Sequence, residues 1–67
     1  MTVVILKKFG DEVQLKSAMD DKLLEYLRML EKARFDRETK AWYIHESEIE
    51  EFIEFIEARG FEVTRFN

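Results

Sequence analysis

The alternation of apolar and polar positions divides the start of the chain into two short strands. Residues 3–9 are mainly apolar and β-branched, and residues 12–17 alternate between polar and apolar side chains. Gly10 and Asp11 stand between them, and a glycine in the first of two loop positions suits a type II′ turn. The pattern therefore predicts a β-hairpin.

Two later segments have apolar residues at i, i+3, i+4 and i+7, the spacing of an amphipathic helix. The first helix is predicted over residues 22–32, with Asp20 or Asp21 as its N-cap, and the second over residues 46–59. The apolar stripes are Leu23, Tyr26, Leu27 and Leu30 in the first helix and Ile49, Phe52, Ile53 and Ile56 in the second. Both stripes indicate a face that packs on a core.

Two different starts fit the second helix. Ser47 with Glu50 matches a capping box, whereas His45 as N-cap would place Glu48 at the third helical position. The sequence leaves both starts open.

The stretch between the two helices predicts a second hairpin. Residues 34–35 form a short strand, 36–39 a polar turn, and 40–43 a strand that is rich in aromatic residues. After the second helix, Gly60 at the C′ position predicts a Schellman ending. Residues 61–66 then alternate, which predicts a closing strand.

An offset of 26 residues aligns the two halves of the chain without a gap: Lys8-Phe9 falls on Arg34-Phe35, and the two helical stripes coincide. We therefore interpret residues 1–67 as one domain of two ββα units, about 1–33 and 34–60, followed by the closing strand. The predicted fold class is α+β, in the order ββαββαβ. It has a mostly antiparallel five-stranded sheet with both helices on one face.

Composition limits what so short a chain can do. A domain of 67 residues buries only about 60% of its unfolded surface, which leaves little room for a deep active site. It has no cysteine, and hence neither a disulfide nor a thiolate metal site. We expect a soluble, cytoplasmic protein, because no apolar run is long enough to span a membrane and no signal peptide is recognisable. Abundant Glu, Lys and Arg without proline favours a thermophilic source.

The residues needed for catalysis or metal binding are lacking. His45 is the sole histidine, and with Glu48 it offers at most two ligands, whereas zinc requires three or four. Ser17 and Ser47 have no base with an orienting acid nearby, and no glycine-rich phosphate loop exists. We therefore expect no enzymatic activity, no metal and no cofactor.

The net charge of −4 is distributed unevenly. Residues 1–45 carry nine Lys or Arg and eight Asp or Glu, a balance of +1, whereas residues 46–67 carry two Arg and seven Glu, a balance of −5. Net acidity disfavours nonspecific nucleic-acid binding. Because the acidity is concentrated in the second helix and beyond, it does not exclude a basic surface elsewhere.

The second hairpin carries the residues that most favour nucleic-acid binding. Trp42, the only tryptophan, lies close in sequence to Arg34, Arg37 and Lys40 and is followed by Tyr43. Bases stack on aromatic faces, and guanidinium and ammonium groups attract phosphates. We predict that these five residues contact DNA.

The acidic second helix supports a rival hypothesis, a surface that docks a basic protein partner. Phe55 stands off the core stripe of this helix, and Met29 holds the equivalent position in the first. With Glu50 and Glu54 they form the predicted docking residues. A third interpretation is an idealised or engineered domain without a ligand, which the near-repeat and the absence of proline would suit.

The second hairpin also matches the pattern Phe-Asp-x-x-Thr-Lys-x-Trp over residues 35–42. Together with the element order over residues 13–66, this hairpin resembles the HARP domain of annealing helicases. It is also similar to the N-terminal damage-recognition domain of XPB-type superfamily-2 helicases. The resemblance implies a DNA-repair accessory domain that recognises forks, junctions or distorted duplex and presents them to a helicase motor, in the same chain or as a stand-alone relative.

Carried over by position, the resemblance assigns Phe35, Asp36 and Thr39 to holding the hairpin, and Lys40 and Trp42 to facing the ligand. The strongly acidic second helix departs from the family pattern. The Walker motifs of a motor domain are absent from these residues, so helicase activity itself is not expected of them.

Overall fold

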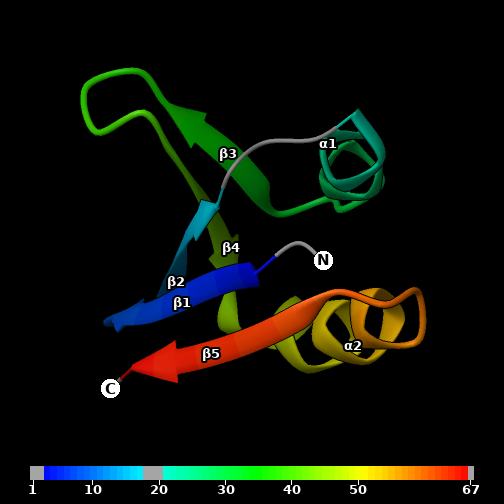
Figure 1. Cartoon of the computed structure of the whole chain (residues 1–67). Coiled ribbons are helices and arrows are strands. Elements are labelled where there is room, and N and C mark those ends of the chain that lie inside the picture. Colours follow the sequence, from blue (N-terminus) through cyan, green and yellow to red (C-terminus); the bar gives the residue numbers. More distant parts are fainter. Residues whose placement is uncertain (1–2, 18–20, 67) are drawn as a thin grey trace.

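The computed structural model describes residues 3–17 and 21–66, and its elements follow the order ββαββαβ (Figure 1). The predicted α+β fold class is confirmed. The elements are β1 (Val3–Phe9), β2 (Glu12–Ser17), α1 (Asp21–Arg28), β3 (Ala33–Asp36), β4 (Ala41–His45), α2 (Glu46–Glu57) and β5 (Glu62–Phe66). Asp20, one of the two predicted caps of the first helix, lies outside the described residues.

The strands form one sheet in the order β3-β4-β2-β1-β5. Neighbouring strands are antiparallel except β1 and β5, which run parallel with Val4 opposite Val63. β4 and β1 are both antiparallel to β2, so they run in the same direction. Because the crossover helix α2 returns the chain in the direction of β4, β5 is parallel to its neighbour β1. The sheet is therefore mostly antiparallel, as predicted.

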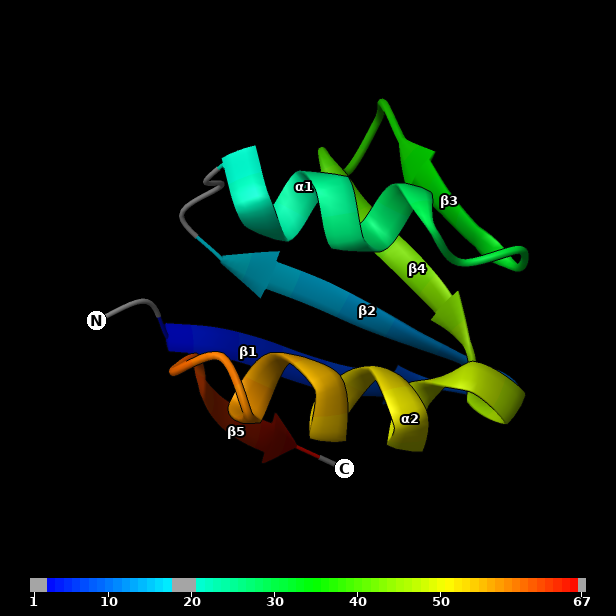
Figure 2. The ribbon, with the colours of Figure 1, turned by 90° about the vertical axis from the view of Figure 1, so that its right-hand side faces the viewer.

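Both helices cover the same face of the sheet, in front of the strands in Figure 2, with α1 towards β3 and β4 and α2 towards β5. We call this the covered face and the opposite side the open face. The buried core lies between the covered face and the helices. It consists of Val4, Leu6, Val13, Leu15, Leu23, Leu27, Ile44, Ile49, Phe52, Ile53 and Ile56. Each such side chain contributes about 1.5–3 kcal/mol by leaving water.

The first helix is shorter than predicted, since α1 ends at Arg28 and the prediction extended to residue 32. The next two N–H groups bond to carbonyls three residues back, which tightens the last turn. The N–H groups of Glu31 and Lys32 donate instead to the carboxylate of Glu48, at 3.2 and 2.8 Å. A side chain from α2 thus satisfies backbone groups that a longer α1 would have used.

The second helix has well-defined caps at both ends. His45 is its N-cap, because its Nδ1 accepts the N–H of Ser47 at 3.1 Å. Gly60 has φ +91°, and the N–H of Phe61 donates to the carbonyl of Ile56 at 3.1 Å. This is the predicted Schellman ending.

The 26-residue offset relates the helices but not the hairpins. Phe9 lies on the open face beside Tyr43, with ring centroids 6.5 Å apart. Phe35, its counterpart at the same offset, lies on the covered face beside Trp42, with centroids 5.8 Å apart. A difference of one residue in register moves a strand residue to the other face. The internal repetition is therefore a property of the helical stripes.

The core predicts a clear contrast between two positions on or next to α1. Leu27 is fully buried, whereas Met29 is 69% exposed. We expect Leu27→Ala to lower the free energy of unfolding by about 2–5 kcal/mol, because it leaves a cavity. The control Met29→Ala should change it by less than about 0.5 kcal/mol. Guanidinium unfolding followed by Trp42 fluorescence measures both, and equal losses would contradict this description of the core.

Candidate nucleic-acid interface

The β3–β4 hairpin lies at one edge of the sheet, and its turn extends away from both helices (Figure 1). Within the turn, Oδ1 of Asp36 accepts the N–H of Glu38 at 2.9 Å, as in an Asx turn. The Thr39 hydroxyl lies 3.4 Å from the hydroxyl of Tyr43 and so connects the turn to β4. Lys40 ends the turn with φ +55°, a left-handed conformation that costs a residue other than glycine about 1–2 kcal/mol.

The five residues predicted to contact DNA do not share one face of the hairpin. Trp42 lies on the covered face, Arg34 and Tyr43 pair with each other on the open face, and Arg37 and Lys40 belong to the turn. Successive side chains of a strand point to opposite faces of the sheet. One ligand segment therefore cannot contact Trp42 and Tyr43 from the same side.

On the open face, Arg34 is engaged within the protein itself. Its guanidinium donates to both carboxylate oxygens of Glu12, at 2.9 and 3.1 Å, and lies 4.6 Å from the centre of the Tyr43 ring. The Tyr43 hydroxyl accepts a hydrogen bond from the buried Gln14 amide at 3.0 Å. Glu12 neutralises the charge of Arg34, and the Arg34 guanidinium covers the Tyr43 ring. Arg34 and Tyr43 are therefore less available to a ligand than the other predicted contacts.

On the covered face, Trp42 forms part of a hollow beside α1. The Trp42 and Phe35 rings meet at an angle of 59° with centroids 5.8 Å apart. The hollow has a volume of about 540 Å³ and is lined by Ser17, Leu24, Arg28, Phe35, Lys40 and Trp42. Trp42 is half-buried, so it packs against the core and also lines this hollow.

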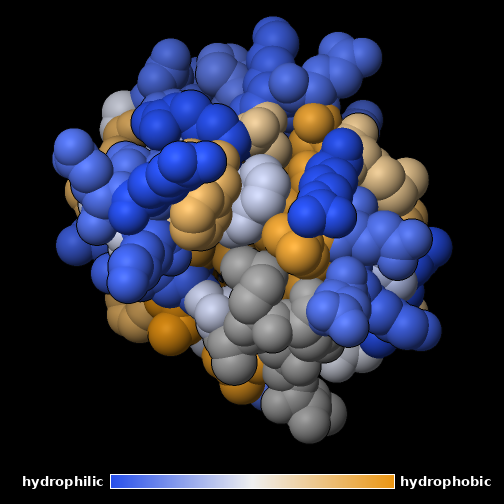
Figure 3. All heavy atoms as spheres, turned by 90° about the horizontal axis from the view of Figure 1, so that it is seen from above, coloured by the Kyte–Doolittle hydropathy of each residue, from blue (hydrophilic) through white to orange (hydrophobic). Residues whose placement is uncertain are grey.

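The charge of the hollow differs from that of the whole chain. Among the residues that the structure describes, its lining contains Arg28 and Lys40 but no carboxylate. Within residues 3–17 and 21–66, neither cation forms an ion pair, and neither does Arg37 in the turn, whereas Arg34, Lys8 and Arg65 all pair with carboxylates. Seen from above, a band of hydrophobic residues lies between two groups of hydrophilic residues (Figure 3). The hollow therefore combines exposed aromatic surface with two cations that have no ion-pair partner among the described residues.

Two residues of this hollow were not among the DNA contacts predicted from the sequence. Phe35 matched the family pattern as a hairpin residue, yet it is 47% exposed. Arg28 was not considered, because its contribution depends on how α1 packs beside β4. The sequence did contain a signal, because Leu24 is apolar but lies off the core stripe, and Arg28 follows one turn later on the same side of the helix.

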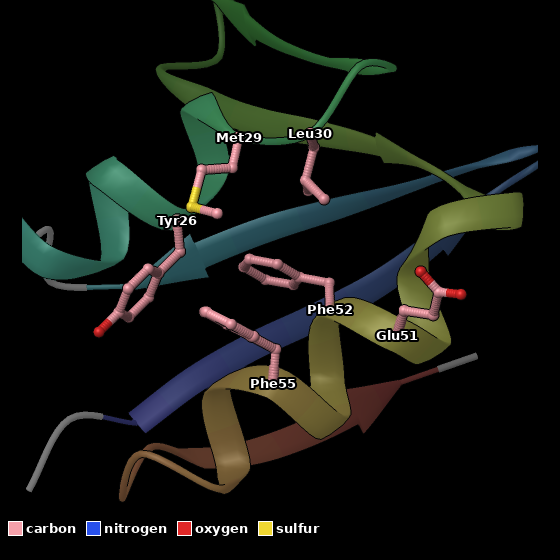
Figure 4. A pocket seen from close by; sticks show the side chains of 6 residues that line it. All are labelled: Tyr26, Met29, Leu30, Glu51, Phe52 and Phe55. Atoms are coloured by element: carbon pink, nitrogen blue, oxygen red, sulfur yellow. The ribbon is translucent and has the colours of Figure 1, made fainter.

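The predicted docking residues are also only partly brought together. Met29 and Phe55 line a groove between the helices (Figure 4). Glu50, however, faces β5, where its carboxylate accepts hydrogen bonds from Arg65 at 2.9 and 3.4 Å. Glu54 is exposed on α2, and Glu51 lines the groove in place of the two predicted glutamates.

No metal site was found in the part of the chain that the structure describes, since no three His, Asp or Glu side chains cluster there. His45 is the α2 cap, with Nε2 3.9 Å from Asp11. None of the described helices has the length and apolar character needed to cross a membrane. No protein-family model matches the chain, and neither a curated protein nor a solved structure matches it.

The Arg34–Glu12 pair predicts a pH effect on the open face. Hydrogen bonds from Arg34 hold the pKa of the Glu12 carboxyl below its ordinary value. A carboxyl whose pKa is lower in the folded chain stabilises the fold above its unfolded pKa and loses this contribution as the pH falls through the folded value. Arg34→Met should therefore raise the pKa of Glu12 towards the ordinary value of a glutamate carboxyl.

The stability difference between wild type and Arg34→Met should be present at neutral pH and shrink as the pH falls from the unfolded pKa of Glu12 through its lower folded pKa. NMR titration of the Glu12 carboxyl and chemical unfolding across pH measure the two quantities. Identical Glu12 titrations in both proteins would rule out the proposed pairing in solution.

Proposed function

We propose that this chain is a non-catalytic DNA-binding module that holds a single-stranded segment against Phe35 and Trp42. The observation that carries the proposal is the hollow on the covered face. There, the rings of Phe35 and Trp42 line the site together with Arg28 and Lys40, and no carboxylate of the described residues lines it. Aromatic surface beside unpaired cations suits a base and its phosphates together.

The aromatic component favours unpaired bases over regular duplex. In duplex DNA each base face is already stacked on its neighbours, whereas an unpaired base can leave the stack and lie on an aromatic side chain. Such stacking contributes about 1–3 kcal/mol per base. Forks, junctions and distorted duplexes all offer unpaired bases, and they are the DNA structures that the resemblance to HARP and XPB-type domains implies.

The cationic component would hold the backbone of the same strand. Arg28 comes from α1 and Lys40 from the end of the turn, so the two cations reach the hollow from different elements. Arg37, in the same turn, adds a third unpaired cation within the described residues. Each phosphate contact releases a bound counterion and makes the affinity depend on salt.

The acidity of the chain does not oppose this placement. α2 starts where β4 ends and then runs towards β5, away from the turn of the β3–β4 hairpin (Figure 2). Two of its carboxylates are also compensated: Glu46 lies 4.0 Å from Lys8, and Glu50 bonds to Arg65. The hollow therefore forms a local cationic region on an acidic protein.

The resemblance supports a role as an accessory domain of a helicase motor. Lys40 and Trp42 hold the positions that face the ligand in the family pattern, and both line the hollow. Phe35 extends that ligand surface beyond the pattern. In this proposal the module contributes recognition of DNA structure, while a motor domain supplies the ATP-driven step.

Fluorescence anisotropy with labelled single-stranded, duplex and forked DNA tests the proposal across a salt series. We expect single-stranded and forked DNA to bind more tightly than duplex. Arg28→Ala and Lys40→Ala should each reduce the slope of log affinity against log salt by about 0.7, the value for one phosphate contact on a single strand. Phe35→Ala should weaken binding by about tenfold or more with little change in slope.

Arg34→Ala is the matched control, because it removes a cation of the same hairpin from the opposite face. Its salt slope should equal that of the wild type, and unfolding curves should show that every variant folds. Absence of binding to all three DNAs at low salt would reject the proposal. A loss in Arg34→Ala equal to that in Lys40→Ala would move the site to the open face.

A further inference from the structure

A second surface, separate from the hollow, lies in the groove between α1 and α2. The groove has a volume of about 180 Å³ and is lined by Tyr26, Met29, Leu30, Glu51, Phe52 and Phe55 (Figure 4). Phe52 is buried and forms its floor, whereas Met29 is 69% exposed and stands at its rim. A single large apolar side chain from another molecule would fill a groove of this size.

The walls of the groove are held in place by contacts within the protein. Tyr26 and Phe55 meet edge to face, with centroids 4.9 Å apart and an interplanar angle of 82°. Arg59 lies 3.5 Å from the centre of the Phe55 ring and donates to the Phe55 carbonyl at 3.0 Å. At the other end, Glu48 ties α2 to the chain after α1. The groove is thus preformed, which lowers the entropic cost of binding.

The charges around the groove indicate the chemistry of its occupant. Glu51 lines the groove itself, one helical turn before Phe55 on α2. Glu25 is exposed on α1, four residues before Met29. In the part of the chain that the structure describes, neither carboxylate forms an ion pair. The nearby cation Arg59 is already engaged with Phe55.

We propose that this groove binds a basic amphipathic helix of a partner protein. The helix would insert one large apolar side chain over Phe52 and place Lys or Arg side chains near Glu25 and Glu51. Helix-in-groove recognition uses apolar anchors of this kind, and opposite charges at the rim select the partner. A second copy of the chain fits less well, because its own groove would present the same carboxylates.

This surface is independent of the proposed DNA site. The hollow is lined by Leu24 and Arg28, and the groove by Tyr26, Met29 and Leu30, so the two sites lie on different sides of α1. A variant at the groove rim can therefore be tested without altering the hollow.

The test uses a labelled model peptide of about 15 residues, long enough to form a helix, built from Ala and Lys around one central Leu. Its counterpart has Glu in place of every Lys. We expect the basic peptide alone to bind in anisotropy titrations at low salt and to shift amide NMR signals of α1 and α2 around the groove. Met29→Lys and Glu51→Lys should each weaken this binding by about tenfold.

Glu57→Lys is the matched control, since it makes the same charge change on an exposed α2 position that does not line the groove. It should leave the affinity within about twofold of wild type. DNA binding by Met29→Lys should also be unchanged, which separates failure of this proposal from failure of the DNA proposal. Sedimentation of the free protein at several concentrations shows whether copies associate through the groove.

Any of four results would overturn the proposal. These are no binding of the basic peptide at low salt, equal binding of the acidic peptide, equal losses in Glu51→Lys and Glu57→Lys, or a concentration-dependent dimer that Met29→Lys abolishes. The last result would instead identify the groove as a contact between two copies of the chain.

Discussion

The antiparallel pairing of β4 with β2 is the interaction on which the rest of this structure depends. It joins the second hairpin to the first and places Trp42 opposite Leu15 on the covered face. It also sets the start of α2, whose first N–H, from Glu46, donates to the carbonyl of Asp11 at 2.9 Å. A slip of one residue in this pair would exchange Trp42 and Tyr43 between the two faces. The core, the hollow and the acidic helix are thus aligned by a single strand pair.

α1 contributes residues to both the hollow and the groove. Its buried leucines anchor it to the sheet, while its two flanks border different sites. Leu24 and Arg28 line the hollow, whereas Tyr26 lines the groove together with Met29, just beyond the end of the helix. A rotation of this one helix would change both sites at once. The hollow and the groove have different linings, but both depend on the position of α1.

Local sequence patterns were sufficient to predict most elements of the fold. The turn at Gly10, with φ +62°, and the ending at Gly60 depend on residues that are neighbours in the chain. The apolar stripes depend only on helical spacing, and they identified the core faces of both helices. Such features can be predicted because the interactions that determine them span only a few residues.

The parts that could not be predicted depend on contacts between distant residues. The end of α1 is set by the carboxylate of Glu48, which follows Lys32 by 16 residues. The parallel pairing of β1 with β5 depends on where α2 returns the chain. The predicted DNA contacts all belong to one hairpin, but the strand register divides them between the two faces of the sheet. Arg28 and Trp42 line the same hollow only because α1 packs on the sheet beside β4.

The left-handed backbone of Lys40 has a consequence for the sequence space open to this domain. At φ +55° a glycine would relieve about 1–2 kcal/mol of local strain, and its greater freedom in the unfolded chain would offset only about 0.5–1 kcal/mol of that gain. Selection for folding alone would therefore favour glycine at position 40. Lysine at this position thus lowers the stability of the fold but supplies a positive charge to the hollow. A library of variants ranked only by resistance to heat would tend to lose the cation from this surface, even though the fold improved.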